Sequence, residues 1–203
     1  KPEYFTGEHY QFSLMSPFFN PGPNADGHVP IYLAAVNRYN CRLAGEMCDG
    51  IRLHPLTGYK YTRDVVLPAI EADARKAGRK LADVDIVGMP FIATGKNTSE
   101  VEKSKQDAKQ RISFYASTRT YHPVLDHSGW GDVGQKLYQM SLEGKWQEMP
   151  ALISDEVVEE FATVGTYDEI GPKLRERWGG LFDAIHLDLP GKILDDEGLV
   201  KAI

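Results

Sequence analysis

The first candidate for chemistry is the pair Arg52 and His54 in the segment GIRLHP, where the two polar residues alternate with isoleucine and leucine. Successive side chains of a strand point to opposite faces, so Arg52 and His54 share one face of the predicted strand. In a parallel barrel the apolar face meets the outer helices, and polar groups are tolerated inside, mainly at the carboxyl ends of the strands. The pattern therefore places Arg52 inside a barrel and His54 at its rim.

A second polar pair, His186 and Asp188, repeats this pattern in the late segment FDAIHLDLP. Charged side chains that alternate with apolar ones towards the end of a strand are typical of a site at a barrel mouth. An ion pair of Arg52 with Asp188 inside the barrel would be compatible with scaffolding alone. The residues leave both interpretations open, and we treat Arg52, His186 and Asp188 as substrate-side or inner-barrel candidates.

The segment PIYLAAVNR ends a predicted strand in small residues and then turns into a helix. The residues at this turn are Ala34, Ala35, Val36, Asn37 and Arg38. Small side chains let a flat ring approach the backbone, free N–H groups at a helix start attract phosphate, and arginine adds a fork of donors. The alternative is close packing of the helix on the sheet, with Arg38 in solvent. From these residues alone the two interpretations are equally supported.

The elements that must position these residues alternate along the chain. We expect strands at 31–36, 51–54, 84–95 and 182–190, and helices at 39–48, 62–76, 98–117 and after Thr166. Pro68 should kink the second helix and Gly78 should follow its end. Asn97 with Glu100, and Thr166 with Glu169, have the spacing of capping boxes. This order predicts a parallel sheet covered by helices, either a barrel or a doubly wound sheet, with an insert of short helices at about 118–162.

Composition narrows the class of protein. The 203 residues carry a formal net charge of -6, which argues against nucleic acid as the main partner. No apolar run reaches the roughly 20 residues that cross a membrane, and the sequence has no HExxH, paired CxxC, GxSxG, GxGxxG or Walker motif.

Cys41 and Cys48 lie about two helical turns apart, too far for a disulfide. A chain of this size with only these two cysteines indicates a reducing, cytoplasmic location. No metal site is predicted.

An ordered series of motifs carries a family resemblance. FTGEHYQFSLMSPFFNPGP, PIYLAAVNRYNCRLAGEMCDGIRLHP, the insert GWGDVGQKLYQMSLEGKWQEMPALISDEVVEEFATVGT and the late VGTYDEI…LRER helix follow one another in the order of that family. The chain resembles the luciferase-like monooxygenase superfamily over residues 3 to 188, most closely its coenzyme F420-dependent oxidoreductases. The resemblance rests on the whole series, because each motif is short and apolar.

The resemblance implies a fold and a cofactor. The family fold is a TIM-type (β/α)8 barrel with an inserted segment before the last strand, often dimeric. Its members bind FMN or the deazaflavin F420 at the carboxyl ends of the strands. By resemblance, Ala34–Arg38 lie against the cofactor, and His54 with the loop through Thr57 lies near its phosphate-bearing tail. Val36-Asn37-Arg38 replaces the Gly-rich or Gly-Pro turn of many F420 members, so the backbone contacts of those glycines are not expected here.

The length implies an incomplete barrel. A (β/α)8 barrel typically needs about 250 residues. We expect residues 1–203 to be one domain that supplies the C-terminal half, about four βα units and the insert. Strands one to four, with the catalytic residues, are expected upstream of Lys1. The chain would then be the C-terminal part of a longer protein, or a truncated product that pairs with another chain or with itself.

The predicted function is an F420-dependent oxidoreductase that transfers a hydride between the cofactor and a small organic substrate. One alternative is an FMN-dependent monooxygenase that uses O2. A second alternative, from another class, is a non-catalytic half-barrel that binds flavin or serves assembly.

Overall fold

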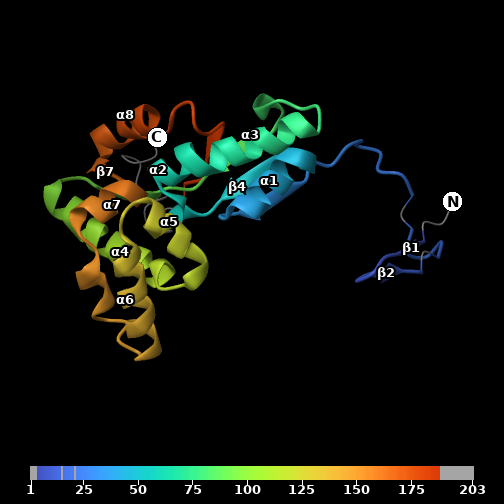
Figure 1. Ribbon diagram of the computed structural model, residues 1–203. Helices are drawn as coiled ribbons and strands as arrows, with labels where there is room; N and C mark the ends of the chain where they lie inside the picture. The colour runs from blue at the N-terminus through green and yellow to red at the C-terminus, as the bar shows by residue number, and fades with distance from the viewer. Residues whose placement is uncertain (1–3, 15, 21, 188–203) are drawn as a thin grey trace. The chain divides into compact units, whose positions relative to one another are not determined.

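The computed structural model describes residues 4–14, 16–20 and 22–187, and they are traced in Figure 1. The contacts divide the chain into two units, residues 1–30 and 31–203. The described part of the first unit contains a short antiparallel pair, β1 (Phe5–Thr6) and β2 (Gln11–Phe12). The remaining strands and helices belong to the second unit.

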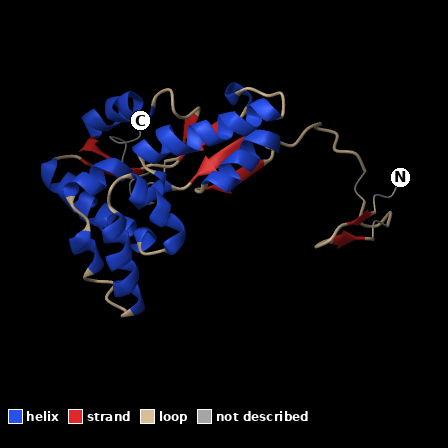
Figure 2. Cartoon of the chain, viewed as in Figure 1, coloured by secondary structure: helices blue, strands red, loops and turns tan. Residues whose placement is uncertain are grey.

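Parallel strands form the centre of the second unit. They are β3 (Tyr32–Ala35), β4 (Gly50–Leu53), β5 (Asp85–Gly88), β6 (Phe91–Gly95), β7 (Ala162–Thr166) and β8 (Ala184–Ile185). One sheet has the order β3-β4-β5-β8, and β6 pairs with β7. Each of these pairings is parallel. Figure 2 shows the strands among helices, which confirms the predicted α/β class.

Helices connect the strands. They are α1 (Arg38–Met47), α2 (Tyr59–Tyr61), α3 (Leu67–Lys76), α4 (Thr98–Ala116), α5 (His122–His127), α6 (Gly131–Leu142), α7 (Asp155–Phe161) and α8 (Tyr167–Trp178). Single 3₁₀ turns lie at Pro55–Thr57, Leu81–Asp83, Arg119–Tyr121 and Met149–Leu152. The segment predicted as an insert consists mainly of α5, α6, α7 and two of these turns, as expected.

The predicted strand 84–95 is two strands, so that prediction was wrong in one respect. Met89 and Pro90 separate β5 from β6. Pro90 has no N–H to donate to a neighbouring strand, so the ladder cannot continue through it. The break lets the two halves take different partners, since β5 pairs with β4 and β8 while β6 pairs with β7.

Strand β7 was missed by the sequence prediction, which assigned its first residue to the insert and the rest to a connection. The strand follows α7 without an intervening residue and is followed at once by α8. Neither end therefore carries the turn residues that usually mark a strand. Its β-branched residues Thr163, Val164 and Thr166 are the remaining signal.

The helix predicted at 62–76 begins earlier and is irregular before Pro68, where a kink was expected. Residues Thr62–Val66 form a π-helical turn, in which the Leu67 N–H donates to the carbonyl of Thr62. Pro68 lies in the first turn of α3, where its missing N–H is tolerated. Gly78 follows the helix with φ of 73°, the left-handed conformation expected of a helix stop.

Both predicted N-terminal caps are present. At α4 the Asn97 side chain accepts a hydrogen bond from the Glu100 N–H at 3.1 Å. The Glu100 carboxylate accepts from the Lys96 N–H, one residue before the position that a capping box uses. At α8 the Thr166 N–H donates to the Glu169 carboxylate at 3.0 Å. These bonds satisfy N–H groups that the helices cannot pair internally.

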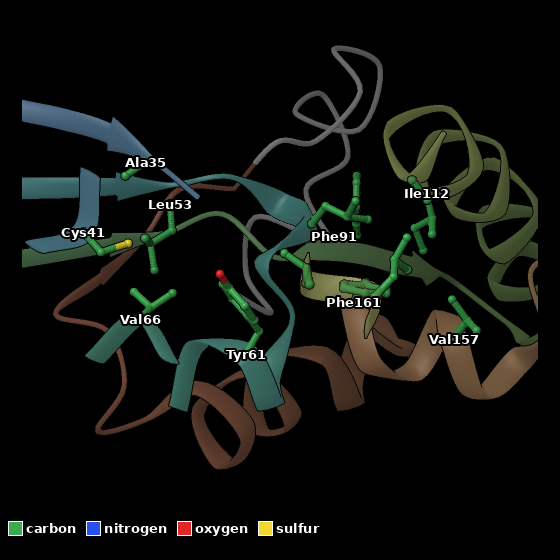
Figure 3. Packing of buried hydrophobic residues seen from close by; sticks show 14 of the residues in the cluster. Ala35, Cys41, Leu53, Tyr61, Val66, Phe91, Ile112, Val157 and Phe161 are labelled. Atoms are coloured by element: carbon green, nitrogen blue, oxygen red, sulfur yellow. The ribbon is translucent and has the colours of Figure 1, made fainter. Parts of the chain in front are cut away.

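A continuous apolar core lies between the sheet and its helices. Figure 3 shows Cys41, Leu53 and Val66 in the same cluster as residues of α4 and α7. Helices α1 and α3 pack so closely that a Cβ at Gly45 would collide with the carbonyl oxygen of Ile70. Glycine at this position permits the close approach. Both cysteines are buried and free. Burial raises the pKa of the Cys41 thiol to about 11, so it packs as a small apolar side chain.

The last predicted strand and the predicted lack of a membrane-spanning segment can be compared with the structure only over the described residues. The last predicted strand, 182–190, is present as Ala184–Ile185, and its end lies outside the described residues. Over the described part of the chain, we find no helix with both the length and the apolar character that crossing a membrane requires.

Candidate functional site

The two faces of β4 differ in the predicted way. Ile51 and Leu53 are buried against the helices, at 0% and 2% exposure, whereas Arg52 is exposed. The register places Ala34 beside Arg52 on β4, with Val87 of β5 next in the row. We call the side of the sheet that carries Ala34 and Arg52 the ligand face. It also carries Tyr32 and Asp85, whose hydroxyl and carboxylate are hydrogen-bonded to each other at the amino ends of the strands.

A cleft of about 470 Å³ opens at the carboxyl ends of β3, β4 and β5. It is lined by Ala34, Ala35, Val36, Asn37, Asn40, Arg52, Leu53, His54, Met89, Thr120 and Tyr121. Each strand is followed directly by one of these lining residues: Val36 follows β3, His54 follows β4 and Met89 follows β5. Ligands of parallel α/β proteins bind at this edge of the sheet. Six of the residues selected from the sequence therefore meet in one concave surface.

The start of α1 forms one wall of the cleft. Asn37 precedes the helix with extended backbone and makes no side-chain capping bond, and the first turn carries no acidic residue. The N–H groups of the first turn have no partner inside the helix, and they carry partial positive charge. Arg52 adds a formal positive charge, and among the described residues no carboxylate lines the cleft. The electrostatic environment favours an anionic or acceptor-rich ligand.

His54 directly follows β4, and its ring packs against two tyrosine rings. Its ring stacks on Tyr121 at 4.7 Å between centroids and meets the edge of Tyr115 at 4.5 Å. Its Nδ1 accepts a hydrogen bond from the Leu56 N–H at 3.2 Å. Burial, and then the nearby Arg111 guanidinium, lower the pKa of His54 to about 4. The imidazole is therefore neutral at physiological pH.

Arg52 and His186 come together across the sheet. An Nη2 hydrogen of Arg52 points to His186 Nδ1 at 3.1 Å. Both side chains are exposed on the ligand face. Ile185 and Leu187 pack instead against α8, beside Trp178, so the predicted alternation extends to the last strand. Asp188, with which Arg52 would pair under the scaffolding interpretation, lies outside the described residues.

Two residues placed near the cofactor by resemblance do not line the cleft. Thr57 is buried, and its hydroxyl donates to the carbonyl oxygen of His54 at 2.8 Å. Its direct role is to hold the turn after β4. Arg38 is exposed at the first position of α1 and lies outside the lining.

Several lining residues were not selected from the sequence. Asn40 lies one turn after Asn37, so helical spacing could have found it. Met89 follows a strand end, but the unbroken strand 84–95 hid that position. Thr120 and Tyr121 come from the 3₁₀ turn at the start of the insert and carry no local signal.

A second cavity, of about 510 Å³, lies between α8, β7 and α2. Its cations are engaged, because Lys173 donates to the Val164 carbonyl and to Glu169, and Arg177 donates to the Glu160 carbonyl. Glu159 and Glu176 also line it. Although this cavity is larger, it lies towards the amino end of β7, and its two acidic and two basic lining residues balance in charge. Within the described ranges, no group of three His, Cys, Asp or Glu side chains is placed to hold a metal ion.

A curated protein matches most of this chain. An uncharacterized protein of Mycobacterium tuberculosis is 33% identical over 181 residues, covering 89% of this chain and 53% of that protein. The chain thus spans about half the length of the curated relatives it matches.

Solved structures share the fold. The coenzyme F420-dependent tetrahydromethanopterin reductase from Methanopyrus kandleri matches with a TM-score of 0.63 and 20% identity, over 79% of this chain and 45% of its own. EDTA monooxygenase from Chelativorans matches with a TM-score of 0.59 and 17% identity, over 98% and 49%. The fold is therefore the luciferase-like TIM barrel, of which this chain supplies about half. The luciferase-like monooxygenase family matches residues 1–183, and the chain belongs to that family.

Proposed function

We propose that this chain forms the cofactor-binding half of an F420-dependent oxidoreductase, which transfers a hydride between the deazaflavin and a small organic substrate. One observation carries the proposal. The cleft at the carboxyl edge brings together the start of α1, Arg52 and His54 around small side chains, and its described lining contains no carboxylate. Family members are oxidoreductases or monooxygenases, which supports an enzyme.

The residues have separable roles in this proposal. Ala34 and Ala35 leave room for a flat ring against β3, because a methyl group is the largest side chain there. The N–H groups at the start of α1, next to Asn37, bind the phosphate of the cofactor tail. Arg52 adds Coulombic attraction to the same anion. His54 offers an uncharged donor from the opposite wall.

Bound F420 would supply the hydride chemistry itself, as an acceptor or donor of two electrons. The apolar side chains of Leu53 and Met89 exclude water from part of the cleft. The catalytic groups that move the proton are not assigned to this chain. The substrate is a small organic molecule that reaches the open side of the cleft.

A direct titration tests the proposal. F420 fluorescence is followed as protein is added, in the complete protein that contains this chain, and the same titration is made with FMN. We expect saturable quenching of F420 and at least tenfold weaker binding of FMN. An Ala34→Trp variant, which fills the cleft beside β3, should abolish F420 binding. Saturable F420 binding that survives this variant would place the cofactor elsewhere.

The second candidate function is an FMN-dependent monooxygenase that uses O2. The fold shared with EDTA monooxygenase and the description of the family favour it. Preferential binding of FMN in the titration, with consumption of O2 when the bound flavin is reduced, would select this candidate. An absorbance spectrum without any bound or bindable flavin, together with a stable assembly, would instead indicate a non-catalytic half-barrel.

We also propose that a second set of strands covers the ligand face. Among the described strands, β3 and β8 form the edges of the main sheet. An open edge exposes unpaired N–H and C=O groups and invites pairing. The partner would be an N-terminal half-barrel in the same protein or a second copy. Mass measurement after size exclusion distinguishes a monomer from a homodimer.

A further inference from the structure

The side chain of His54 carries its proton on Nε2. Nδ1 accepts the Leu56 N–H, and an acceptor nitrogen of imidazole cannot also hold a proton. The single proton of the neutral ring is then on Nε2. Nε2 has no hydrogen-bond partner among the described residues. It is also not among the side-chain atoms that are both buried and without a partner, so it is accessible from the cleft. His54 therefore presents a free donor in the wall of the cleft.

The groups packed against His54 keep it neutral. Arg111, on α4, is the charged group that acts on it, and a neighbouring cation disfavours imidazolium. Tyr115 and Tyr121 cover its ring. Burial raises the pKa of Tyr121, so this phenol stays uncharged. No carboxylate acts on His54 within the described part of the chain.

The two tyrosines reach His54 from a distant part of the chain. Tyr115 lies in the last turn of α4, and Tyr121 is the last residue of the 3₁₀ turn at the start of the insert. Tyr121 also lines the cleft, whereas Tyr115 does not. The stacked and the edge-on neighbour fix the plane of the ring, and the Leu56 N–H bond to Nδ1 fixes which way Nε2 points within that plane.

We propose that Tyr115 and Tyr121 are positioning residues that hold His54 as a neutral hydrogen-bond donor, whose Nε2–H recognises an acceptor oxygen of the ligand in the cleft. The recognition step rests on the proposed function; the positioning step does not. The acceptor is an oxygen of the flavin-type ring or of its phosphate. A neutral N–H donor can bind either oxygen, because the hydrogen bond orients the ligand without adding net charge to the cleft.

The positioning step is tested without ligand. Long-range 1H–15N spectra of histidine-labelled protein report the tautomer of His54 and its titration midpoint. We expect the Nε2–H form, with a midpoint near pH 4. Tyr121→Phe, which keeps the ring, should leave both unchanged. Tyr121→Leu should mix the tautomers and raise the midpoint by about one pH unit or more, because burial is reduced.

A matched control lies in the insert. The ring of Tyr138 meets His122 at 6.2 Å, and His122 does not line the cleft. Tyr138→Leu should leave the signals of His54 unchanged. An Nδ1–H tautomer in the unmodified protein, or no response to Tyr121→Leu, would overturn the positioning step.

The recognition step is tested by affinity. His54→Leu should weaken F420 binding about tenfold, and His54→Gln, whose amide nitrogen lies near the position of Nε2, should restore it to within about threefold. The same series with the phosphate-free deazaflavin nucleoside identifies the oxygen. An equal loss for both ligands indicates the ring, and a loss for F420 alone indicates the phosphate. Tight F420 binding unaffected by His54→Leu overturns recognition, whereas failure of F420 to bind any variant overturns the proposed function and leaves the positioning result standing.

Discussion

The two faces of strand β4 are built from adjacent residues and serve different ends. Ile51 and Leu53 are buried against α1 and the residues around α3, where they stabilise the fold. Arg52 and His54 belong to the ligand face and the cleft, where they contribute charge and a hydrogen-bond donor. A single strand thus separates stability from recognition by the alternation of its side chains. The separation can be tested by mutating each face and measuring both properties.

The largest expected effect is on the buried face. Ile51→Ala should lower the free energy of unfolding by about 2–5 kcal/mol, because it removes buried methyl groups and leaves a cavity. Arg52→Ala, on the exposed face, should change it by no more than about 0.5 kcal/mol. Urea unfolding with a common m value measures both. Equal destabilisation by the two variants would contradict the division of faces.

A smaller effect is expected from the charge of the ligand face. Arg52→Met should weaken F420 binding about tenfold, or about 1.4 kcal/mol, and the difference should shrink as salt is added. The matched control is Arg63→Met, because Arg63 is exposed and paired with Asp64 away from the cleft. If both variants lose the same affinity, the effect is one of net charge and not of Arg52.

The Asn37→Asp substitution should raise the stability of the protein and weaken its binding of the cofactor. Asn37→Asp places a negative charge at the start of α1, which should stabilise the helix by about 0.3–1 kcal/mol. The same charge should weaken binding of the anionic cofactor severalfold. Asn97→Asp is the matched control at the start of α4, and it should leave F420 affinity unchanged. Thermal unfolding and fluorescence titration of the two variants would decide the point, and tighter binding by Asn37→Asp would count against an anion beside α1.

The last prediction is a pH dependence. The pKa of His54 is lowered to about 4 in the folded protein, so between about pH 6.5 and pH 4 the unfolded chain binds more protons. Acidification through this window should therefore lower the stability of the unmodified protein. His54→Gln should have a flatter profile over the same window. Urea midpoints at pH 7, 6, 5 and 4.5 measure the difference, and parallel profiles would show that His54 does not titrate as described.

Much of the fold was predictable because its signals are local. The alternation in GIRLHP assigns each residue of β4 to a face, and the buried residues of α1 follow helical spacing. The caps at Asn97 and Thr166 need only residues three apart. The series of motifs indicated the family, which the comparisons confirm.

The errors occur where local signals are weak or where one residue changes the partner of a strand. Strand β7 is continuous with helices at both ends, so no turn residues delimit it. Pro90 interrupts a mainly apolar run, and β6, which follows it, pairs with β7 instead of continuing β5. The turn after β4 is held by the Thr57 hydroxyl, a contact that the sequence did not indicate, and the position of Thr57 near the cofactor stays a prediction.

The sequence by itself determined which residues of β4 face the core, to within a residue where α1, α4 and α8 begin, and that small residues and polar groups follow the early strands. Tertiary structure alone decided that Tyr115 and Tyr121 enclose His54, that Thr120 and Met89 complete the cleft, and that Arg52 reaches His186. These contacts join residues separated by many positions in the chain. Local periodicity reports which face a side chain occupies, but it carries no information about which distant segment packs against that face.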